Sequence, residues 1–387
     1  ARTRLDSAST RQLLQQAPAA YRTQVNDLLL TALARVIARW TQRSDVLVQL
    51  EGHGREELFD TVDLTRTVGW FTSVFPVRLS PEQTLDASIK RIKEQLRSIP
   101  DKGLGYGALR YLGDEQARAA LAQLPNPHIT FNYLGQFDGS FAPGSDADAS
   151  AFLVPAGESA GASQSSEAPL DNWLSINGQV YAGELNLEWT FSRDMFNVDT
   201  VQRLADQFAA ELKAIVEHCL ADAHAGLTPS DVPLAGLTQA QLDSLPVPAA
   251  LIEDLYPLAP MQQGMLFHSL FEQGGGHYIN QMRVDVKGLD VPRFRLAWQA
   301  AVDRHEVLRA NFVTCFQHPL QVIRRQLELP FTYLDWAGVA EQGAAVDSWA
   351  EADLRKGFDL QHDPLLRLAV IRTSEASCHL VFTSHHI

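Results

Sequence analysis

The chain has 387 residues, a length that predicts two domains or parts of two. Hydrophobic residues make up 45% of it, which is enough for a sizeable core and argues against wholesale disorder. The formal net charge of −14 argues against a nucleic-acid groove, because phosphate binding needs clustered lysines and arginines.

The cysteines and the apolar runs indicate the cellular compartment and whether the chain contacts a membrane. Cys219, Cys315 and Cys378 lie far apart and give neither a disulfide framework nor a metal knuckle, so we expect a reducing cytoplasm. No apolar run reaches the roughly 18 residues of a membrane span, and the N-terminal stretch has no signal peptide, so we expect no membrane partner. The missing initial Met and the abrupt end at Ile387 predict a piece cut from something longer.

The first part of the chain alternates helical and strand patterns. Apolar residues recur at helical spacing from 24 to 40, ending at Trp40, and again from 84 to 99, where Pro100 ends the pattern. Strands are predicted at 45–51 and 72–80, and a third starts at 128 and breaks at Gly135.

The next part begins with a segment of different character. Residues 139–168 are rich in Ala, Gly and Ser with almost no periodicity, which predicts a long mobile surface loop. Asn177-Gly178 between two β-rich runs predicts a hairpin turn. A helix is predicted over 198–220, with one apolar face that ends at Cys219.

Residues 225–250 form a linker candidate, because they carry four prolines and no long apolar face. The pattern then restarts. A strand is predicted within 276–288, a helix from 291, and a strand at 378–387 that enters a His-His turn.

Four unusual runs follow one another in the first block. They are "EGHGRE" at 51–56, "RTVGWFTSVFPV" at 66–77, "KGLGYG" at 102–107 and "FNYLGQFD" at 131–138, and "NDLLLTALA" at 26–34 precedes them. In this order and spacing they resemble the C-terminal half of the epimerization domain of nonribosomal peptide synthetases. The resemblance covers residues 1–222.

The second block resembles the start of a condensation domain of the same synthetases. "YPLAPMQQGMLFHSL" at 256–270 is similar to the opening motif, and "RHEVLRANF" at 304–312 is similar to the second motif. "SHHI" at 384–387 resembles the first half of the HHxxxDG active-site motif. This resemblance covers 251–387, so 223–250 is the predicted interdomain linker.

The resemblance implies an α/β (α+β) fold made of two chloramphenicol-acetyltransferase-like lobes, one from each of two consecutive domains. A complete domain of this kind has two lobes with the active site in the tunnel between them. The HHxxxDG motif of the epimerization domain would lie upstream of Ala1, and the condensation motif is cut after Ile387. We therefore expect the fragment itself to be inactive.

Glu51 is the candidate proton-transfer residue. It follows a predicted strand on a turn that Gly52 and Gly54 allow to be tight, and the resemblance makes it the catalytic glutamate. Burial would raise the pKa of such a carboxyl toward neutrality, so that it could take and return the α-proton of a thioester substrate. The alternative is a loop glutamate paired with Arg55. Glu56 and Glu57 are expected to be solvated.

The resemblance places further residues at the tunnel. Asn132 is a candidate, and Tyr133 could donate a hydrogen bond to the enolate oxygen; its alternative role is a buried tyrosine with its hydroxyl satisfied elsewhere. Trp70 is expected to pack or to line the tunnel. His53 could be a second acid or base, but a structural role is favoured, and no metal site is expected there because further ligands are lacking. "KGLGYG" lacks the spacing of a phosphate loop and predicts a turn.

In the condensation part, His386 resembles the histidine that assists attack of an acceptor amine on a donor thioester. His385 is expected to be structural, at the tunnel. Arg304 and Arg309 are expected to form structural ion pairs rather than to act in catalysis.

The sequence thus predicts an epimerization–condensation junction of a nonribosomal peptide synthetase. Expected partners are carrier protein domains upstream and downstream and the adenylation domain of the following module. The chain itself is expected to bind no cofactor, and the phosphopantetheine arm of a neighbouring carrier protein would deliver the substrate. Two alternatives stay open: a free-standing acyltransferase of the same fold that uses a coenzyme A thioester, and a non-catalytic scaffold that docks carrier proteins.

Overall fold

The computed structural model describes residues 1–56, 58–136, 161, 165, 167–168, 172–221, 224–271 and 278–387. Most of the surface loop predicted at 139–168 lies outside the described residues. The chain divides into two compact units, Ala1–Thr228 and Pro229–Ile387, and each is described by itself.

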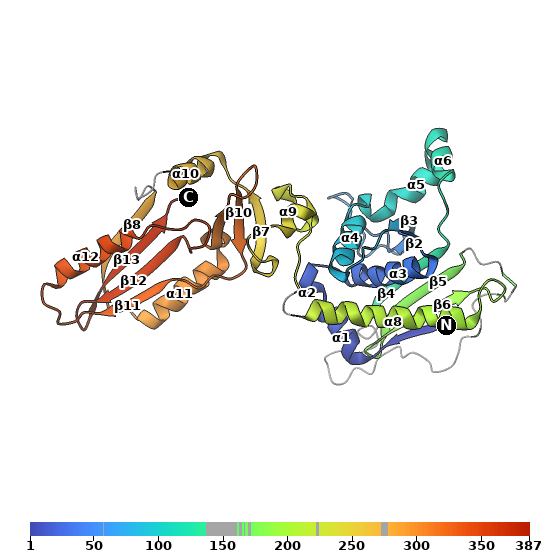
Figure 1. Ribbon diagram of the computed structural model, residues 1–387, viewed down its shortest axis with the longest axis horizontal. Coiled ribbons are helices and arrows are strands. Elements are labelled where there is room, and N and C mark those ends of the chain that lie inside the picture. The colour runs from blue at the N-terminus through green and yellow to red at the C-terminus, as the bar shows by residue number, and fades with distance from the viewer. Residues whose placement is uncertain are drawn as a thin grey trace. The chain divides into compact units, whose positions relative to one another are not determined.

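The first unit is built on a six-stranded sheet in the order β1-β6-β5-β4-β2-β3 (Figure 1). Strands β2, β4 and β5 run parallel to one another, and the other neighbours are antiparallel. The three strands predicted before residue 139 are confirmed as β2, β3 and β4. The strands are β1 (Arg2–Leu5), β2 (Val46–Gly52), β3 (Ser73–Leu79), β4 (Ile129–Gln136), β5 (Leu174–Tyr181) and β6 (Glu184–Phe191).

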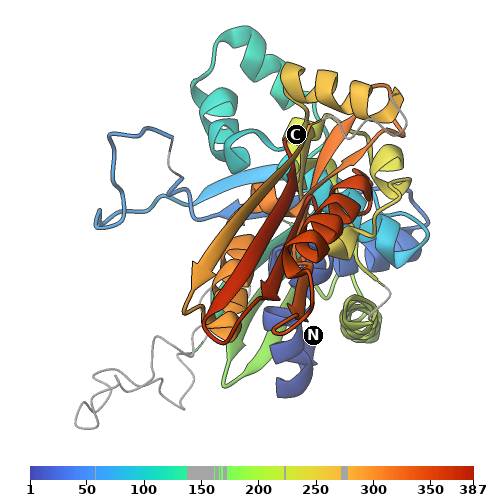
Figure 2. The same cartoon turned by 90° about the vertical axis from the view of Figure 1, so that its left-hand side faces the viewer.

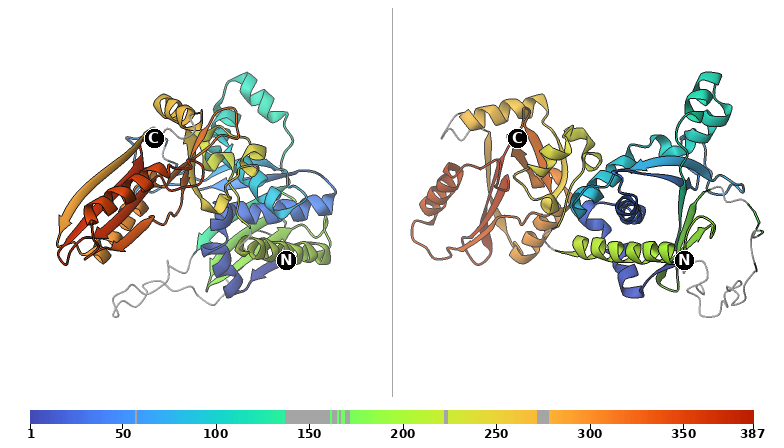
Figure 3. Two further views of the ribbon diagram at one scale, coloured as in Figure 1. Left: turned by 60° about the vertical axis from the view of Figure 1, so that its left-hand side comes forward. Right: turned by 45° about the vertical axis from the view of Figure 1, so that its right-hand side comes forward.

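Helices cover one face of this sheet. The right-hand panel of Figure 3 shows the blue helix α3 and the yellow-green helix α8 on the same side of the strands. The three predicted helices are confirmed as α3 (Val25–Thr41), α4 (Leu85–Arg97) and α8 (Val198–Leu220). The other helices are α1 (Ser7–Gln15), α2 (Pro18–Tyr21), η1 (Pro100–Gly103), α5 (Leu104–Leu112) and α6 (Glu115–Ala122).

The core lies between these helices and the alternate residues of the strands. In β2 the buried residues are Val46, Val48 and Leu50, whereas the residues between them are more exposed. This period of two leaves the opposite face of the sheet to polar side chains. Trp40, predicted on the buried face of α3, is 40% exposed at the end of that helix.

The hairpin predicted at Asn177-Gly178 is wrong. Strand β5 runs through both residues, and the turn to β6 is made by Ala182 and Gly183, with φ of 53° and 73°. A two-residue turn with both φ positive matches the twist of the two strands. A steric constraint explains the glycine at this position instead, since a Cβ on Gly178 would lie 3.2 Å from Cγ of Leu187.

The turn predicted over the run 102–107 is only partly correct. The 3-10 helix η1 ends at Gly103, whose φ is 80° and where a Cβ would lie 2.2 Å from the ring of Phe75. From Leu104 onward the run is α-helical, as the first turns of α5. Gly103 alone therefore needs to be a glycine for conformational reasons.

The second unit contains two sheets, in the orders β7-β10-β9 and β11-β12-β13-β8. Figure 2 shows the helix α12 lying across the red strands of the larger sheet. The predicted strand within 276–288, the helix from 291 and the last strand are confirmed as β8, α11 and β13. The bounds are β7 (Ile252–Pro257), α10 (Pro260–Phe271), β8 (Ile279–Lys287), α11 (Val291–Arg304), η5 (Glu306–Arg309), β9 (Ala310–Val313), β10 (Leu320–Arg324), β11 (Phe331–Asp335), α12 (Gln342–Arg355), β12 (Leu366–Arg372) and β13 (Ser377–His385).

The segment predicted as a linker contains short helices. These are η2 (Pro229–Asp231), η3 (Pro233–Ala235), α9 (Gln239–Asp243) and η4 (Ala249–Leu251). Val232 and Leu242 within it are buried. Among the described residues, no helix is both long enough and apolar enough to cross a membrane.

Candidate active site

Glu51 and Asn132 meet at the carboxyl ends of two parallel strands. Leu50 of β2 pairs with Phe131 of β4, so the next residues of both strands lie side by side. The Asn132 side-chain Nδ2 donates a hydrogen bond to Oε2 of Glu51 over 2.9 Å. Both side chains point to the sheet face opposite the helices, because Leu50 and Phe131 are buried on the helix side. Two predicted site residues are thus brought into contact.

Glu51 is exposed, whereas the sequence-based argument for a catalytic carboxyl required its burial. The alternative, a pairing with Arg55, is also not observed. Within the described parts of the chain, Asn132 is the hydrogen-bond partner of the Glu51 carboxylate. Its Oε1 keeps its acceptor capacity, which a proton-accepting group needs.

Tyr133 lies on the other side of the sheet. As the residue after Asn132, it points toward the helices, where it packs against the core. Its ring lies over Gly178, where an ideal Cβ would be 3.6 Å from Tyr133 Cδ2. Burial raises the pKa of the Tyr133 hydroxyl. The structure therefore does not bring Tyr133 to Glu51, and this placement favours the alternative of a packed tyrosine.

Gly54 and Arg55 hold the loop after β2 in place through contacts with residues 64–71. Gly54 has a φ of 66°, and a Cβ there would lie 1.6 Å from the carbonyl oxygen of Phe71. The Arg55 guanidinium lies 4.3 Å from the centre of the Phe71 ring and donates to the carbonyls of Leu64 (2.8 Å) and Gly69 (3.3 Å). Arginine suits this place because its planar fork can stack and donate at once.

Glu56 is not solvated, so the prediction made for it is wrong. Only 15% of its side chain is exposed, and it pairs with Nζ of Lys102 (2.7 Å) and Nε2 of His53 (3.3 Å). The Nδ1 atom of His53 accepts a hydrogen bond from the backbone N–H of Arg55 over 3.0 Å. Both ring nitrogens are therefore engaged, which supports the structural role for His53. Glu57 lies outside the described residues.

Trp70 does not pack into the first unit. It is 92% exposed, whereas the neighbouring Phe71 lies under Arg55. Packing in the core is thus excluded for Trp70, and the tunnel-wall role remains a prediction. In the part of the chain that the structure describes, no three His, Cys, Asp or Glu side chains gather as a metal site would require.

His385 and His386 end the second unit in different environments. His385 is half-buried near the rings of Tyr278 and Phe358, its Nδ1 accepts from the Ile387 N–H (3.1 Å), and its Nε2 lies 3.3 Å from Ser269 Oγ. His386 is exposed, and its backbone N–H donates to Tyr278 O over 2.7 Å. The His386 imidazole is thus the more accessible of the two.

The burial of His385 predicts a pH-dependent stability of the second unit. Burial and the neighbouring His386 lower the pKa of His385 to about 4, from the ordinary value of 6.5. The unfolded chain takes up this proton at a higher pH than the folded chain. The contribution of neutral His385 to stability is therefore complete above the unfolded-state pKa and falls as the pH drops toward the folded-state pKa. Urea unfolding from about pH 7 to about pH 5 should show a smaller loss of stability for His385→Gln than for wild type.

His318→Gln is the matched control for this experiment, because His318 is an exposed histidine of the same unit. It should keep the pH dependence of the wild type. An identical pH dependence in the His385→Gln variant would contradict the prediction.

The sequence comparisons agree with the architecture of both units. The family model described as "Condensation domain" matches residues 2–233 and 252–387. The chain belongs to the condensation-domain family, and the predicted chloramphenicol-acetyltransferase-like α/β fold is confirmed.

Particular relatives are components of peptide synthetases. One component of the linear gramicidin synthase of Brevibacillus parabrevis is 43% identical over 392 residues, covering 100% of this chain and 8% of that protein. One component of the mycosubtilin synthase of Bacillus subtilis is 38% identical over 387 residues, covering 98% of this chain and 14% of that protein. The chain therefore spans a small part of the length of these curated relatives.

A solved structure supports the resemblance of the first block. The crystal structure of the epimerization domain from the third module of tyrocidine synthetase B matches with a TM-score of 0.51 and 38% identity. The match covers 57% of this chain and 48% of that domain. The predicted resemblance to synthetase epimerization and condensation domains is confirmed.

Proposed function

We propose that the chain is part of a nonribosomal peptide synthetase in which residues 1–222 belong to an epimerization domain and 251–387 to the N-terminal lobe of a condensation domain. Residues 223–250 would link them. The first domain would convert the L-aminoacyl or peptidyl thioester on a carrier protein to the D form, and the second would join it to the next residue. The ordered motifs and the similarity to the tyrocidine epimerization domain support this proposal.

The observation that carries the proposal is the Glu51–Asn132 pair. A thioester acidifies its neighbouring Cα–H, so a positioned carboxylate can remove that proton and leave an enolate. The Asn132 amide holds Oε2 of Glu51, which leaves Oε1 to meet the substrate. Inversion is completed when a second acid, on the opposite face of the planar enolate, donates a proton to Cα, and Glu51 releases the proton that it took to solvent. We assign the first transfer to Glu51 and the positioning of its carboxylate to Asn132.

The exposed position of this pair suits a substrate that arrives on a long arm. Phosphopantetheine of a neighbouring carrier domain would present the thioester to Glu51 at the ends of β2 and β4. In the second unit, the exposed imidazole of His386 would assist attack of the acceptor amine. Carrier domains and the following adenylation domain are thus the proposed partners.

The test uses the synthetase polypeptide that contains this sequence, with its carrier domain loaded with an L-aminoacyl thioester in deuterium oxide. Deuterium at Cα and the D content after hydrolysis are followed with time. We expect deuterium to enter at Cα and the product to approach a mixture of L and D forms.

The same assay separates the proposal from its alternatives. Peptide-bond formation without Cα exchange would leave a condensation activity only, and the epimerization proposal would be wrong. Neither exchange nor peptide formation would favour a docking scaffold. Transfer of an acyl group from a free coenzyme A thioester would favour the free-standing acyltransferase.

A further inference from the structure

A cavity of the first unit lies at the end of the parallel strands opposite Glu51 and Asn132. It has a volume of about 850 Å³, within the range of small-molecule sites, and is formed where β2, β4 and β5 begin and α3 ends. Val46, which lines the cavity, and Glu51 are five positions apart on β2, roughly 17 Å along the strand. The cavity is therefore distinct from the candidate active site.

The cavity combines an apolar floor with aromatic walls. Buried Val46, Ile129 and Leu174 contribute to its lining. His128 and Trp173 stack with ring centres 3.8 Å apart and planes inclined by 6°, while 46% of Trp173 remains exposed. This half-exposed stacked pair offers a flat surface to a planar ring.

A second aromatic pair completes the wall. Trp40 and Phe196 meet with ring centres 6.0 Å apart and planes inclined by 52°. Trp40 is 40% exposed at the point where α3 ends. Large aromatic side chains that line a cavity without filling it leave room for an apolar ligand.

The charges at the cavity favour an anion. Arg43 and Arg78 line it, both are exposed, and within the described ranges neither guanidinium has a hydrogen-bond or ion-pair partner. Asp45 is the one acidic residue among the described lining residues. Guanidinium groups recognise carboxylates with particular strength, so two arginines at one cavity without a partner among the described residues suit a carboxylate ligand.

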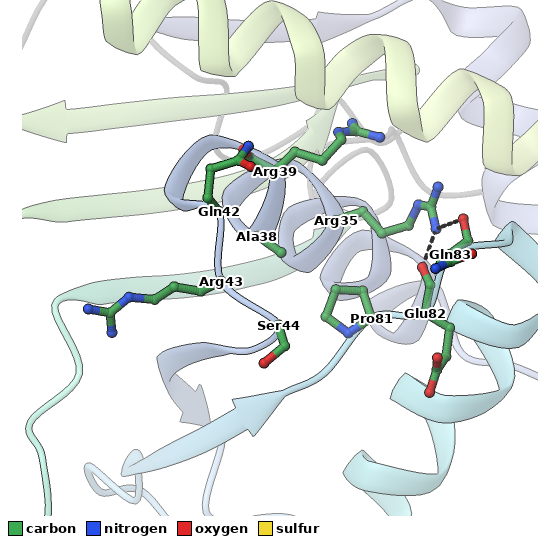
Figure 4. Close-up of a pocket in the computed structure, with 9 residues that line it drawn as sticks. All are labelled: Arg35, Ala38, Arg39, Gln42, Arg43, Ser44, Pro81, Glu82 and Gln83. Carbon is green, nitrogen blue, oxygen red and sulfur yellow. Dashed lines mark hydrogen bonds between the residues drawn. The ribbon is translucent and has the colours of Figure 1, made fainter.

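The neighbouring arginines of α3 are already engaged. Arg35 donates to Glu211 and to the carbonyls of Glu82 and Gln83, and Arg39 pairs with Glu211. Figure 4 shows Arg35 turned toward Glu82 and Gln83, whereas Arg43 extends away from them. Arg43, which follows the end of α3, thus remains available to a ligand.

We propose that this cavity binds a planar aromatic compound that carries a carboxylate. The ring would lie against the Trp173 and Trp40 side, and the carboxylate would pair with Arg43 and Arg78. This site is independent of the Glu51 chemistry and of the proposed synthetase function.

The test measures binding of 2-naphthoate to the full chain by isothermal titration calorimetry and saturation-transfer NMR, with the neutral analogue 2-naphthamide as a comparison. We expect saturable binding of 2-naphthoate at least about tenfold tighter than that of 2-naphthamide. The double variant Arg43→Gln/Arg78→Gln should reduce the affinity for 2-naphthoate to that for the amide. Trp173→Ala should weaken binding of both compounds.

Arg118→Gln is the matched control, because Arg118 is an exposed arginine of the same unit outside the cavity, and it should leave both affinities unchanged. Arg43 and Arg78 are exposed, so their replacement should not unfold the protein. Absence of saturable 2-naphthoate binding would overturn the proposal. Equal affinity for acid and amide, or 2-naphthoate binding unchanged in the double variant, would do the same.

Discussion

Replacement of Glu51 by glutamine is expected to slow deuterium entry at Cα by about 10²- to 10⁴-fold, the usual contribution of a positioned general base. Glutamine keeps the size of the side chain and an oxygen that can accept the bond from Asn132 Nδ2. It cannot take a proton near neutral pH. Because Glu51 is exposed, the change should leave the unfolding free energy of the first unit nearly unaltered.

The matched control is Gln49→Ala, two residues earlier on β2 and on the same face of the sheet as Glu51. It should leave the exchange rate near that of wild type. If Glu51→Gln exchanges as fast as wild type, Glu51 is not the base, and the base lies elsewhere. If both variants lose exchange equally, the effect belongs to the strand and not to the carboxylate.

The neighbourhood of Glu51 could be predicted in part, because β2 and β4 are each visible as local patterns. Their parallel pairing brings Glu51 to Asn132, and that contact joins residues 81 positions apart. The placement of Tyr133 beside Glu51 could have been rejected from the sequence alone. Phe131 and Tyr133 are two residues apart in a strand, so both share the core face.

The hairpin error has a local cause. Asn-Gly is a strong turn signal, but strands β4 and β6 pack on both sides of residues 177–178 and keep β5 extended. The actual turn places Ala182 at positive φ, a conformation that is uncommon for alanine and that the sequence therefore does not predict. Tertiary pairing therefore overrides the local preference.

The ion pairs could not be located from the sequence, because their partners are distant along the chain. Lys102 and Glu56 are 46 residues apart, and neither of the two motifs that contain them predicts this contact. The expectation of structural ion pairs for Arg304 and Arg309 is confirmed for one of them. Arg309 is buried and pairs with Glu253, whereas Arg304 is exposed and has no ion pair among the described residues.

Arg309 is the more consequential of these two arginines because its buried guanidinium donates to several acceptors at once. Its Nε donates to the carbonyl of Val302 over 3.1 Å, and its Nη1 donates to the carbonyls of Arg324 and Arg325 and to Glu253. These contacts join α11, β10 and β7 in the second unit. A methionine would fill much of the volume but could donate none of these hydrogen bonds.

Arg309→Met is therefore expected to lower the free energy of unfolding of the second unit by about 1.5–3 kcal/mol, the usual contribution of hydrogen bonds from a charged group. Urea unfolding of the full chain, followed by circular dichroism and by hydrogen exchange in β10, would measure it. Arg304→Met is the matched control and should change stability by less than about 0.5 kcal/mol, because its side chain is exposed. Equal effects of the two substitutions would mean that the bonds of Arg309 to Glu253 and the three carbonyls add nothing net, since the cost of burying the guanidinium would then offset them.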